Sequence, residues 1–308
     1  QLEHHGKDAE MITVFGSTNL DQIGTVPRLP KPGETVAGGT FSMAAGGKGA
    51  NQALAARRAG AEVRHVSAVG EDAFAPLALD LLEEGGVDLS HLRKADTATG
   101  IAMIFVDAEG ENVIAILPGA NGTVSAADAE RGLSDLKAGD VVLVQQEVPQ
   151  AASRRALEIA RQKGATSLFN TAPFLDDTPE LAALADIVVA NETEFALLSG
   201  RPIEELDAAM SEWVERTGTT IVVTLGPEGA RARTPDGAIA VPAHKVTPVD
   251  TVGAGDTFCG YLGAALEAGH DLETALRRAA VAGSLACLKS GAQPAIPMKA
   301  DVDAIAGA

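Results

Sequence analysis

The segment VDTVGAGDTFCGYLG, residues 249–263, places one aspartate, Asp256, in a turn of small residues at the expected start of a helix. A glycine-rich helix start exposes backbone N–H groups and attracts anions. A carboxylate at this position has two explanations. It is either a helix N-cap, a position that aspartate favours, or a general base that takes a proton from a hydroxyl group beside a bound phosphate.

A second glycine-rich segment, AAGGKGANQA at residues 44–53, carries Lys48. Its glycines allow backbone N–H groups to approach a ligand closely. Neither segment matches the common nucleotide motifs. A Walker A loop needs glycine where Ser42 stands, and a dinucleotide fingerprint needs glycine where Phe258 stands. The missing fingerprint disfavours a nicotinamide-dependent oxidoreductase.

Short β-rich segments alternate with helical segments from about residue 141 onward, with helices expected at 203–217, 254–268 and 272–289. This alternation predicts a doubly wound α/β fold with a mostly parallel sheet flanked by helices. Ligands of such sheets bind at the carboxyl ends of the strands. The residues that follow five predicted strands at this rim are Asn19 and Asp21, Glu147, Asn191 and Glu194, Thr224 and Gly226, and Asp250 and Asp256.

Two further segments, at about residues 20–45 and 97–119, are rich in Gly, Thr and Val and lack a helical period. We expect them to join as a small β-sheet that acts as a lid and also forms a dimer contact. Phe41, Met43 and Phe105 are expected in the core of this lid. Residues 11–308 are predicted to form one domain with this lid, after a tag-like or loose extension at residues 1–10.

The composition narrows the possible partners and compartment. The 24 basic and 42 acidic residues give a formal charge of −18, which disfavours binding to nucleic acid or to an anionic membrane. The two cysteines cannot form a disulfide framework, and the histidines lack zinc-site spacing. No apolar run reaches the length of a membrane span, and no signal peptide is visible. We therefore expect a cytoplasmic protein.

The two glycine-rich segments, as GGKGANQA and DTVGAGDTFCGYL, resemble the two signatures of the ribokinase/fructokinase family of carbohydrate kinases. The resemblance extends over residues 11–308, because GSTNLD, PGETVAGG, ENVIAILPGAN, NETE, TLGPEG and GAQPAIP stand in the order found in that family. It implies ATP-dependent phosphorylation of a sugar hydroxyl, with D-ribose and its 5-phosphate as the favoured substrate and product. The alternatives are a kinase for another sugar or for a nucleoside, and a non-catalytic sugar-binding regulator.

The resemblance also implies roles for individual residues. Asp256 would be the general base, and the N–H groups of Gly253, Ala254 and Gly255 would form an anion hole. The residues that would contact the sugar are Asn19, Asp21, Gly47, Lys48, Asn51 and Glu147.

The remaining implied roles concern the nucleotide and the ions. Glu194 would organise Mg²⁺ through water together with Asn191, which also belongs to the nucleotide site with Thr224, Gly226 and Gly229. The residues that would hold an activating K⁺ are Asp250, Val252, Ala286, Lys289 and Gly291. Related proteins often have serine where Ala295 stands, so this chain offers one oxygen fewer near the K⁺ site.

Overall fold

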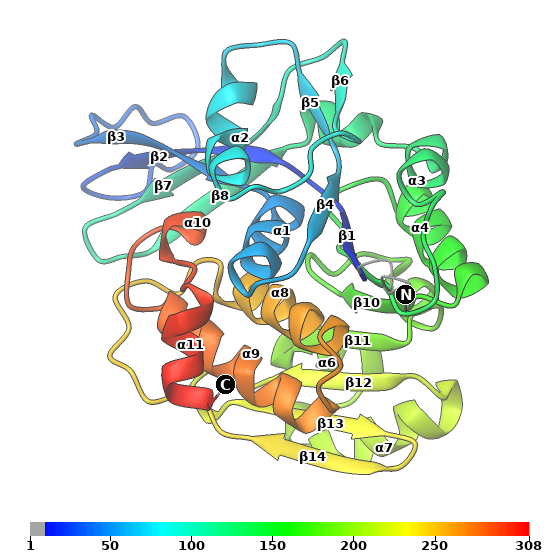
Figure 1. Ribbon diagram of the computed structural model, residues 1–308. Coiled ribbons are helices and arrows are strands. Elements are labelled where there is room, and N and C mark those ends of the chain that lie inside the picture. The colour runs from blue at the N-terminus through cyan, green and yellow to red at the C-terminus, as the bar shows by residue number, and fades with distance from the viewer. Residues whose placement is uncertain (1–9, 308) are drawn as a thin grey trace.

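An eight-stranded sheet forms the centre of the molecule, in the order β14-β13-β12-β11-β10-β9-β1-β4 (Figure 1). The computed structural model describes residues 10–307, so the expected N-terminal extension lies, except for Glu10, outside the described residues. The strands of this sheet are β1 (Ile12–Phe15), β4 (Val63–Val66), β9 (Val141–Val144), β10 (Thr166–Asn170), β11 (Ile187–Asn191), β12 (Thr220–Thr224), β13 (Ala230–Thr234) and β14 (Gly237–Val241).

The six neighbouring strands β4, β1, β9, β10, β11 and β12 of this sheet run parallel. This confirms the prediction of a mostly parallel sheet. At the other edge, β13 and β14 form an antiparallel hairpin that extends the sheet beyond the predicted βαβ units. The carboxyl ends of the parallel strands therefore lie along one rim, as the sequence pattern predicts.

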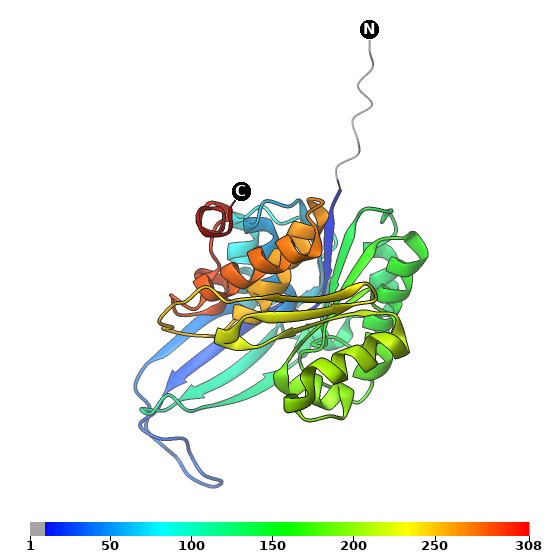
Figure 2. The same ribbon diagram turned by 90° about the horizontal axis from the view of Figure 1, so that it is seen from below.

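Helices cover both faces of this sheet, and side chains alternate between the two cores. Ile12 and Val14 pack into one core cluster with α1, α2, α8, α9 and α11, whereas Phe15 packs into the other with α3 to α7. Figure 2 shows α8 and α9 on one side of the strands and α7 on the other. The helices are α1 (Lys48–Arg58), α2 (Phe74–Glu84), α3 (Ala126–Gly132), α4 (Gln150–Lys163), α5 (Thr178–Ala182), α6 (Glu192–Ser199), α7 (Leu206–Thr217), α8 (Ala254–Glu267), α9 (Leu272–Ala286), α10 (Ala292–Ala295) and α11 (Lys299–Ala306), with 3₁₀ turns η1 (Gly119–Thr123), η2 (Ile203–Glu205) and η3 (Gly226–Glu228).

Two predicted helices differ from the observed ones at an end. The segment 203–217 begins as the 3₁₀ turn η2 before α7 starts at Leu206. The last long helix ends at Ala286 instead of Lys289. The carbonyl oxygen of Cys287 accepts hydrogen bonds from the backbone N–H groups of Val249 and Asp250. The chain after α9 therefore forms hydrogen bonds with the loop before α8 and does not continue the helix.

A second, four-stranded sheet joins the two β-rich segments, in the order β3-β2-β7-β8. Its strands are β2 (Asn19–Thr25), β3 (Phe41–Gly46), β7 (Gly100–Val106) and β8 (Asn112–Leu117). A tight turn with Gly110 at φ 87° connects β7 to β8. Figure 2 shows that this small sheet projects away from the main body. A separate two-stranded ladder is formed by β5 (Ala68–Gly70) and β6 (Arg93–Ala95), which come between β3 and β7 in the sequence.

The small sheet exposes apolar side chains in the single chain. Phe41, Met43 and Phe105 are 66%, 44% and 37% exposed, so the expectation that they form a lid core is wrong for the isolated subunit. The strand register places Phe41 and Phe105 on one face beside Gly24, and Asp21 lies on the opposite face because side chains alternate along a strand. The apolar face of the small sheet is therefore opposite the face that carries Asp21, which is predicted to bind the sugar. Within residues 10–307, no helix has the length and apolarity to cross a bilayer.

Candidate active site

Asp256 lies in the first turn of α8, but it does not cap that helix. The N-cap residue is Gly253, at φ 76°, and no side chain caps the helix. The two carboxylate oxygens of Asp256 instead accept hydrogen bonds from side chains of α1. Asn51 Nδ2 donates to Oδ2 at 2.9 Å, and Gln52 Nε2 donates to Oδ1 at 3.1 Å. The structure thus excludes the cap explanation and leaves a buried carboxylate at a glycine-rich turn.

Close packing of α1 against α8 makes these contacts possible. A Cβ atom added to Gly260 would lie 2.5 Å from Ala55 Cβ and 2.6 Å from the carbonyl oxygen of Gln52. Only glycine allows the two helix backbones to approach to this distance. Gly260 of the second signature therefore allows α8 to pack closely enough on α1 for Asp256, one turn earlier, to contact Asn51 and Gln52.

A pocket lies beside Asp256, between the starts of α1 and α8 and the carboxyl ends of β10, β11 and β12. A Cβ atom added to Gly255 would meet no atom within 4 Å, which leaves the turn open. The pocket joins seven predicted site residues. Its lining consists of Lys48, Asn170, Ala172, Val189, Ala190, Asn191, Glu194, Thr224, Gly253, Gly255, Asp256 and Cys259.

Lys48 supplies the positive charge of this pocket. Burial alone would lower the pKa of its ammonium group, but Asp256, Glu147 and Glu194 outweigh burial, and the pKa lies above its ordinary value. The side chain is therefore a cation at neutral pH. The Lys48 ammonium group is a compact cation that can pair with a phosphate oxygen.

Glu147, which follows β9, contacts the start of α1. Its Oε2 atom accepts hydrogen bonds from the backbone N–H of Lys48 at 3.0 Å and from Ser17 Oγ at 2.6 Å. Gly47, at φ 91°, lies so close to the chain at Thr18 and Asn19 that an added Cβ would be 2.7 Å from the Asn19 nitrogen. Glu147 and Gly47 thus bring β2, α1 and the end of β9 together.

Asp21 lies on β2, with its carboxylate over Gly46, where an added Cβ would be 2.4 Å from a carboxylate oxygen. Burial, together with the charges of Glu147 and Asp256, raises the pKa of Asp21 to about 7. Among residues 10–307, no group donates a hydrogen bond to this carboxylate. The arrangement brings three carboxyl groups to one site and leaves Asp21 with acceptor capacity for a ligand.

The two asparagines on the predicted sugar side differ in the hydrogen bonds of their side-chain oxygens. Asn19 Oδ1 accepts a hydrogen bond from Asn121 Nδ2 at 2.7 Å. Asn121 also accepts from the backbone N–H of Thr18 and donates to its carbonyl oxygen. The Oδ1 atom of Asn51 is buried and, within the described chain, has no hydrogen-bond partner. It is therefore an acceptor that a ligand hydroxyl can satisfy.

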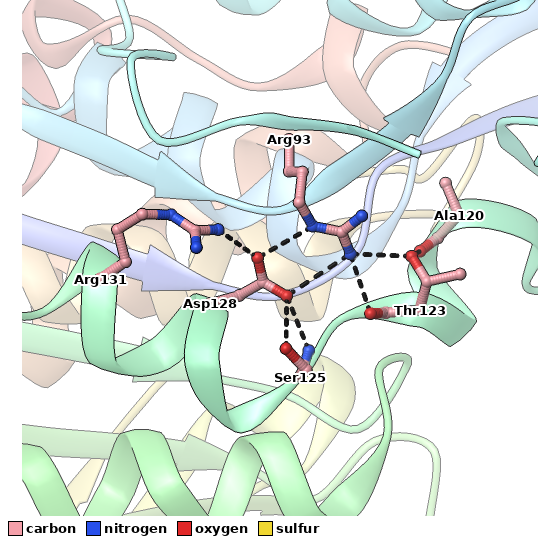
Figure 3. Close-up of polar contacts among 6 residues, drawn as sticks. All are labelled: Arg93, Ala120, Thr123, Ser125, Asp128 and Arg131. Carbon is pink, nitrogen blue, oxygen red and sulfur yellow. Dashed lines mark hydrogen bonds and ion pairs between the residues drawn. The ribbon is translucent and has the colours of Figure 1, made fainter. Parts of the chain in front are cut away.

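Asn121 lies on η1, which an ion-pair cluster attaches to the main body. Figure 3 shows Asp128 between Arg93 and Arg131. The guanidinium group of Arg93 also donates to the carbonyl and hydroxyl oxygens of Thr123, both at 2.8 Å. Burial alone would raise the pKa of Asp128, but its hydrogen bonds with Arg93 and Ser125 hold it below the ordinary value. The cluster therefore stays charged and stabilises the turn that carries Asn121.

The residues predicted to bind the nucleotide and Mg²⁺ are only partly joined in the pocket. Asn191 and Glu194 form a capping box at the start of α6, with Glu194 Oε2 also accepting from Thr171 Oγ1 at 2.8 Å. Thr224 lines the pocket, whereas Gly226 and Gly229 lie in the turn after β12, outside the pocket lining. Within residues 10–307, no cluster of three or more His, Cys, Asp or Glu side chains suits a metal ion.

The residues predicted to hold K⁺ lie outside the pocket lining, in the loop before α8 and in the segment that runs from the last residue of α9 to Gly291. Asp250 Oδ2 accepts from the backbone N–H of Gly291 at 2.9 Å, and Oδ1 accepts from that of Val252 at 3.0 Å. An added Cβ on Gly253 would lie 2.8 Å from the Ala292 side chain, so these loops support the turn before α8. Ala286 and Ala295 are buried, and Lys289 is exposed.

The sequence patterns missed several polar residues around Asp256. Gln52 donates to Asp256, Gln145 donates to Gln52, and Asn170 accepts from Gln52. A signal was available, because Gln52 and Gln145 are polar residues within otherwise apolar, buried segments. Cys259 also lines the pocket, and burial raises the pKa of its thiol well above the ordinary value.

Comparison with known proteins identifies the family. The profile of the "pfkB family carbohydrate kinase" matches residues 9–299. The chain is 36% identical to a Salmonella typhi protein named deoxyribokinase, over 93% of this chain and 95% of that protein. It is also 36% identical to a ribokinase of Bacillus subtilis, over 95% and 98% of the two chains. The structure of an Arabidopsis thaliana ribokinase complexed with ribose and ATP superposes with a TM-score of 0.87 at 30% identity, over 97% and 99% of the two chains. The glycine-rich turn, the buried aspartate and these matches over nearly the whole length lead to one conclusion: the chain belongs to the pfkB family of carbohydrate kinases.

Proposed function

We propose that this protein transfers the terminal phosphoryl group of ATP to a hydroxyl of D-ribose, forming D-ribose 5-phosphate. The observation that carries the proposal is the placement of Asp256: its carboxylate faces the pocket beside the Gly253–Gly255 turn and does not cap its own helix. The Bacillus subtilis relative is named ribokinase, and the Arabidopsis thaliana relative was solved with ribose and ATP. These relatives support ribose as the sugar.

The proposed reaction uses Asp256 as the base and the α8 turn as the anion site. Phosphoryl transfer depends mainly on positioning and charge stabilisation. Asp256 takes the proton of the attacking hydroxyl as the oxygen bonds to phosphorus. The N–H groups of Gly253, Ala254 and Gly255, which begin a helix, stabilise the negative charge on the transferred group. Lys48 adds a positive charge on the same side.

The sugar is proposed to lie between β2 and α1. Asp21, Glu147 and the Oδ1 atom of Asn51 are acceptors for its hydroxyl groups, and Asn19, Lys48 and the Gly47 backbone complete the set. Several of these acceptors lack a full set of donors in the described chain. A neutral polyol supplies O–H donors without adding charge.

The pocket also fits Mg²⁺, provided that the ion is held mainly by phosphates and water. Asn191 and Glu194 would be its protein partners, through water, and together with Thr224, Gly226 and Gly229 they would border the nucleotide. One carboxylate and one amide agree with the preference of Mg²⁺ for few protein ligands in nucleotide sites. The bound ion would neutralise phosphate charge.

A monovalent cation is proposed behind the turn that precedes α8. Asp250 and the backbone carbonyl groups of Val252, Ala286, Lys289 and Gly291 form an oxygen-rich set of the kind that suits K⁺. The buried Ala295 offers no side-chain oxygen. The ion would stabilise the geometry of the loops on which Gly253 rests.

Turnover is therefore expected to be faster with K⁺ than with Na⁺ at matched ionic strength. The measurement is the initial rate with each cation, repeated for Asp250→Asn, which should reduce the difference because it removes the charged ligand. Equal rates of the parent protein with K⁺, Na⁺ and a bulky organic cation would count against the site.

We further propose that the small sheet closes over the sugar and pairs with a second copy of the chain. Closure would exclude water, which would otherwise accept the phosphoryl group. The exposed Phe41, Met43 and Phe105 on one face support a subunit contact, because apolar patches of this kind mark interfaces.

The substrate proposal predicts a much higher kcat/KM for D-ribose than for fructose or adenosine. The measurement is nucleotide turnover against a panel of pentoses, hexoses and nucleosides. The panel includes 2-deoxy-D-ribose because of the Salmonella typhi relative. A preference for a hexose or adenosine would overturn ribose and keep the kinase assignment, whereas sugar binding without turnover would favour a non-catalytic regulator.

A further inference from the structure

We propose that Gln52, held by Gln145, is a positioning residue that orients the Asp256 carboxylate for proton transfer. The inference rests on the proposed role of Asp256 as the base. It extends that role to two residues on α1 and at the end of β9 that do not lie in the predicted sugar or nucleotide sets. Both side chains are fully buried.

The two oxygens of Asp256 each have one amide donor. Asn51 Nδ2 donates to Oδ2, and Gln52 Nε2 donates to Oδ1. Both donors come from consecutive residues of α1, so the carboxylate is attached at two points to a single rigid helix. A carboxylate attached at only one oxygen can rotate about its terminal bond, because that torsion is broad. The bond from Gln52 therefore sets the orientation of the carboxylate plane toward the pocket.

The direction of the Gln52 amide is determined by its surroundings. Asn170 Nδ2 donates to the carbonyl oxygen of Val189 at 3.2 Å, so Asn170 Oδ1 is turned toward Gln52 and accepts from Nε2 at 3.3 Å. Gln145 Nε2 donates to Gln52 Oε1 at 2.6 Å. The two hydrogens of Gln52 Nε2 are thus donated to Asn170 and to Asp256. If the Gln52 amide were flipped, its oxygen would face these two acceptor oxygens and could donate to neither.

Gln145 has one polar atom without a partner. Its Oε1 atom is buried and, among the described residues, makes no hydrogen bond. It lies over Gly16, where an added Cβ would be 2.0 Å away. An unsatisfied buried oxygen costs stability. The chain nevertheless places a glutamine here, and the contact that this side chain makes is the one that holds Gln52 toward Asp256.

The test compares Gln52→Met with a matched control, Gln146→Met. Methionine fills the volume of glutamine without a hydrogen-bond donor. Gln146 is also buried and donates to Thr171, Pro173 and Thr178, and not to Asp256. We expect Gln52→Met to lower kcat by roughly 10–100-fold, as small misplacements of a reacting group do, with the KM values for sugar and ATP nearly unchanged. Gln146→Met should lower the melting temperature and leave kcat within about twofold of the parent, because none of the bonds that it loses is made to Asp256, Gln52 or Gln145.

The decisive measurement is a double-mutant cycle with Asp256→Asn. If Gln52 acts through the carboxylate, Gln52→Met should change the residual kcat of Asp256→Asn by less than about twofold. The inference would be overturned if the two substitutions lowered kcat independently, so that their fold-changes multiplied in the double variant. It would also be overturned if Gln52→Met kept the kcat of the parent protein. Full activity of Asp256→Asn alone would instead refute the proposed base. If the methionine variant does not fold, Gln52→Asn is tested in its place, because asparagine is one methylene shorter and its amide no longer reaches Asp256. Failure of both to fold would assign Gln52 to folding and would also overturn the inference.

Discussion

Replacing Asp256 by asparagine is expected to lower kcat by roughly 10²–10⁴-fold, the range for loss of a general acid or base. Asparagine has nearly the same size and keeps an oxygen that Asn51 or Gln52 can bond, but its amide cannot take the proton from the sugar hydroxyl. The loss should appear in kcat more than in KM, because the proton moves in the transition state and not on binding. The measurement is steady-state kinetics with a thermal melt of the same preparation.

Asp301 provides a matched control for this substitution. It occupies the same position in the first turn of α11, where its carboxylate accepts from the backbone N–H of Met298, and it lies outside the proposed site. Asp301→Asn should therefore keep its kcat. A folded Asp256→Asn protein that retains more than about a tenth of kcat in a chemistry-limited assay would contradict the base role, since that loss is smaller than a general base should give.

Replacing Asp21 by asparagine is expected to raise the KM for the sugar by roughly 10–100-fold, which corresponds to the loss of hydrogen bonds worth about 1–3 kcal/mol. The same change should stabilise the unliganded protein at alkaline pH. Burial, Glu147 and Asp256 raise the pKa of Asp21 from 3.8 to about 7. The folded state therefore binds this proton more tightly than the unfolded state, and ionisation costs stability.

The sign of this pH dependence follows from the two pKa values. Below about pH 4 Asp21 is protonated in both states, and its ionisation costs nothing. The cost grows as the pH rises and is complete above about pH 7. The melting temperature of Asp21→Asn should therefore exceed that of the parent protein by more at pH 8 than at pH 5. Ribose provides the internal control, because at equal concentration it should stabilise the parent more than the variant. An unchanged KM, or a difference in melting temperature that shrinks as the pH rises, would contradict this role.

The sequence by itself determined the family, the parallel sheet and the position of the site at one rim. These properties depend on short-range signals: the alternation of apolar strands and helices, and the glycines at the starts of α1 and α8. Such signals lie within a few residues of one another and are readable without knowing the fold. The same signals left two explanations for Asp256, because a carboxylate in the first turn of a helix suits a cap as well as a base.

Only the tertiary structure excluded the cap. Asn51 and Gln52 are separated from Asp256 by 205 and 204 positions in the chain, and no local pattern predicts that their amides meet its carboxylate. The raised pKa of Asp21 likewise depends on burial and on two carboxylates that distant elements bring near it. The end of α9 at Ala286 depends on the loop at Val249 and Asp250. Hydrogen bonds and charge interactions act over a few ångströms in space, so their partners are known only once the chain has folded and the helices have packed.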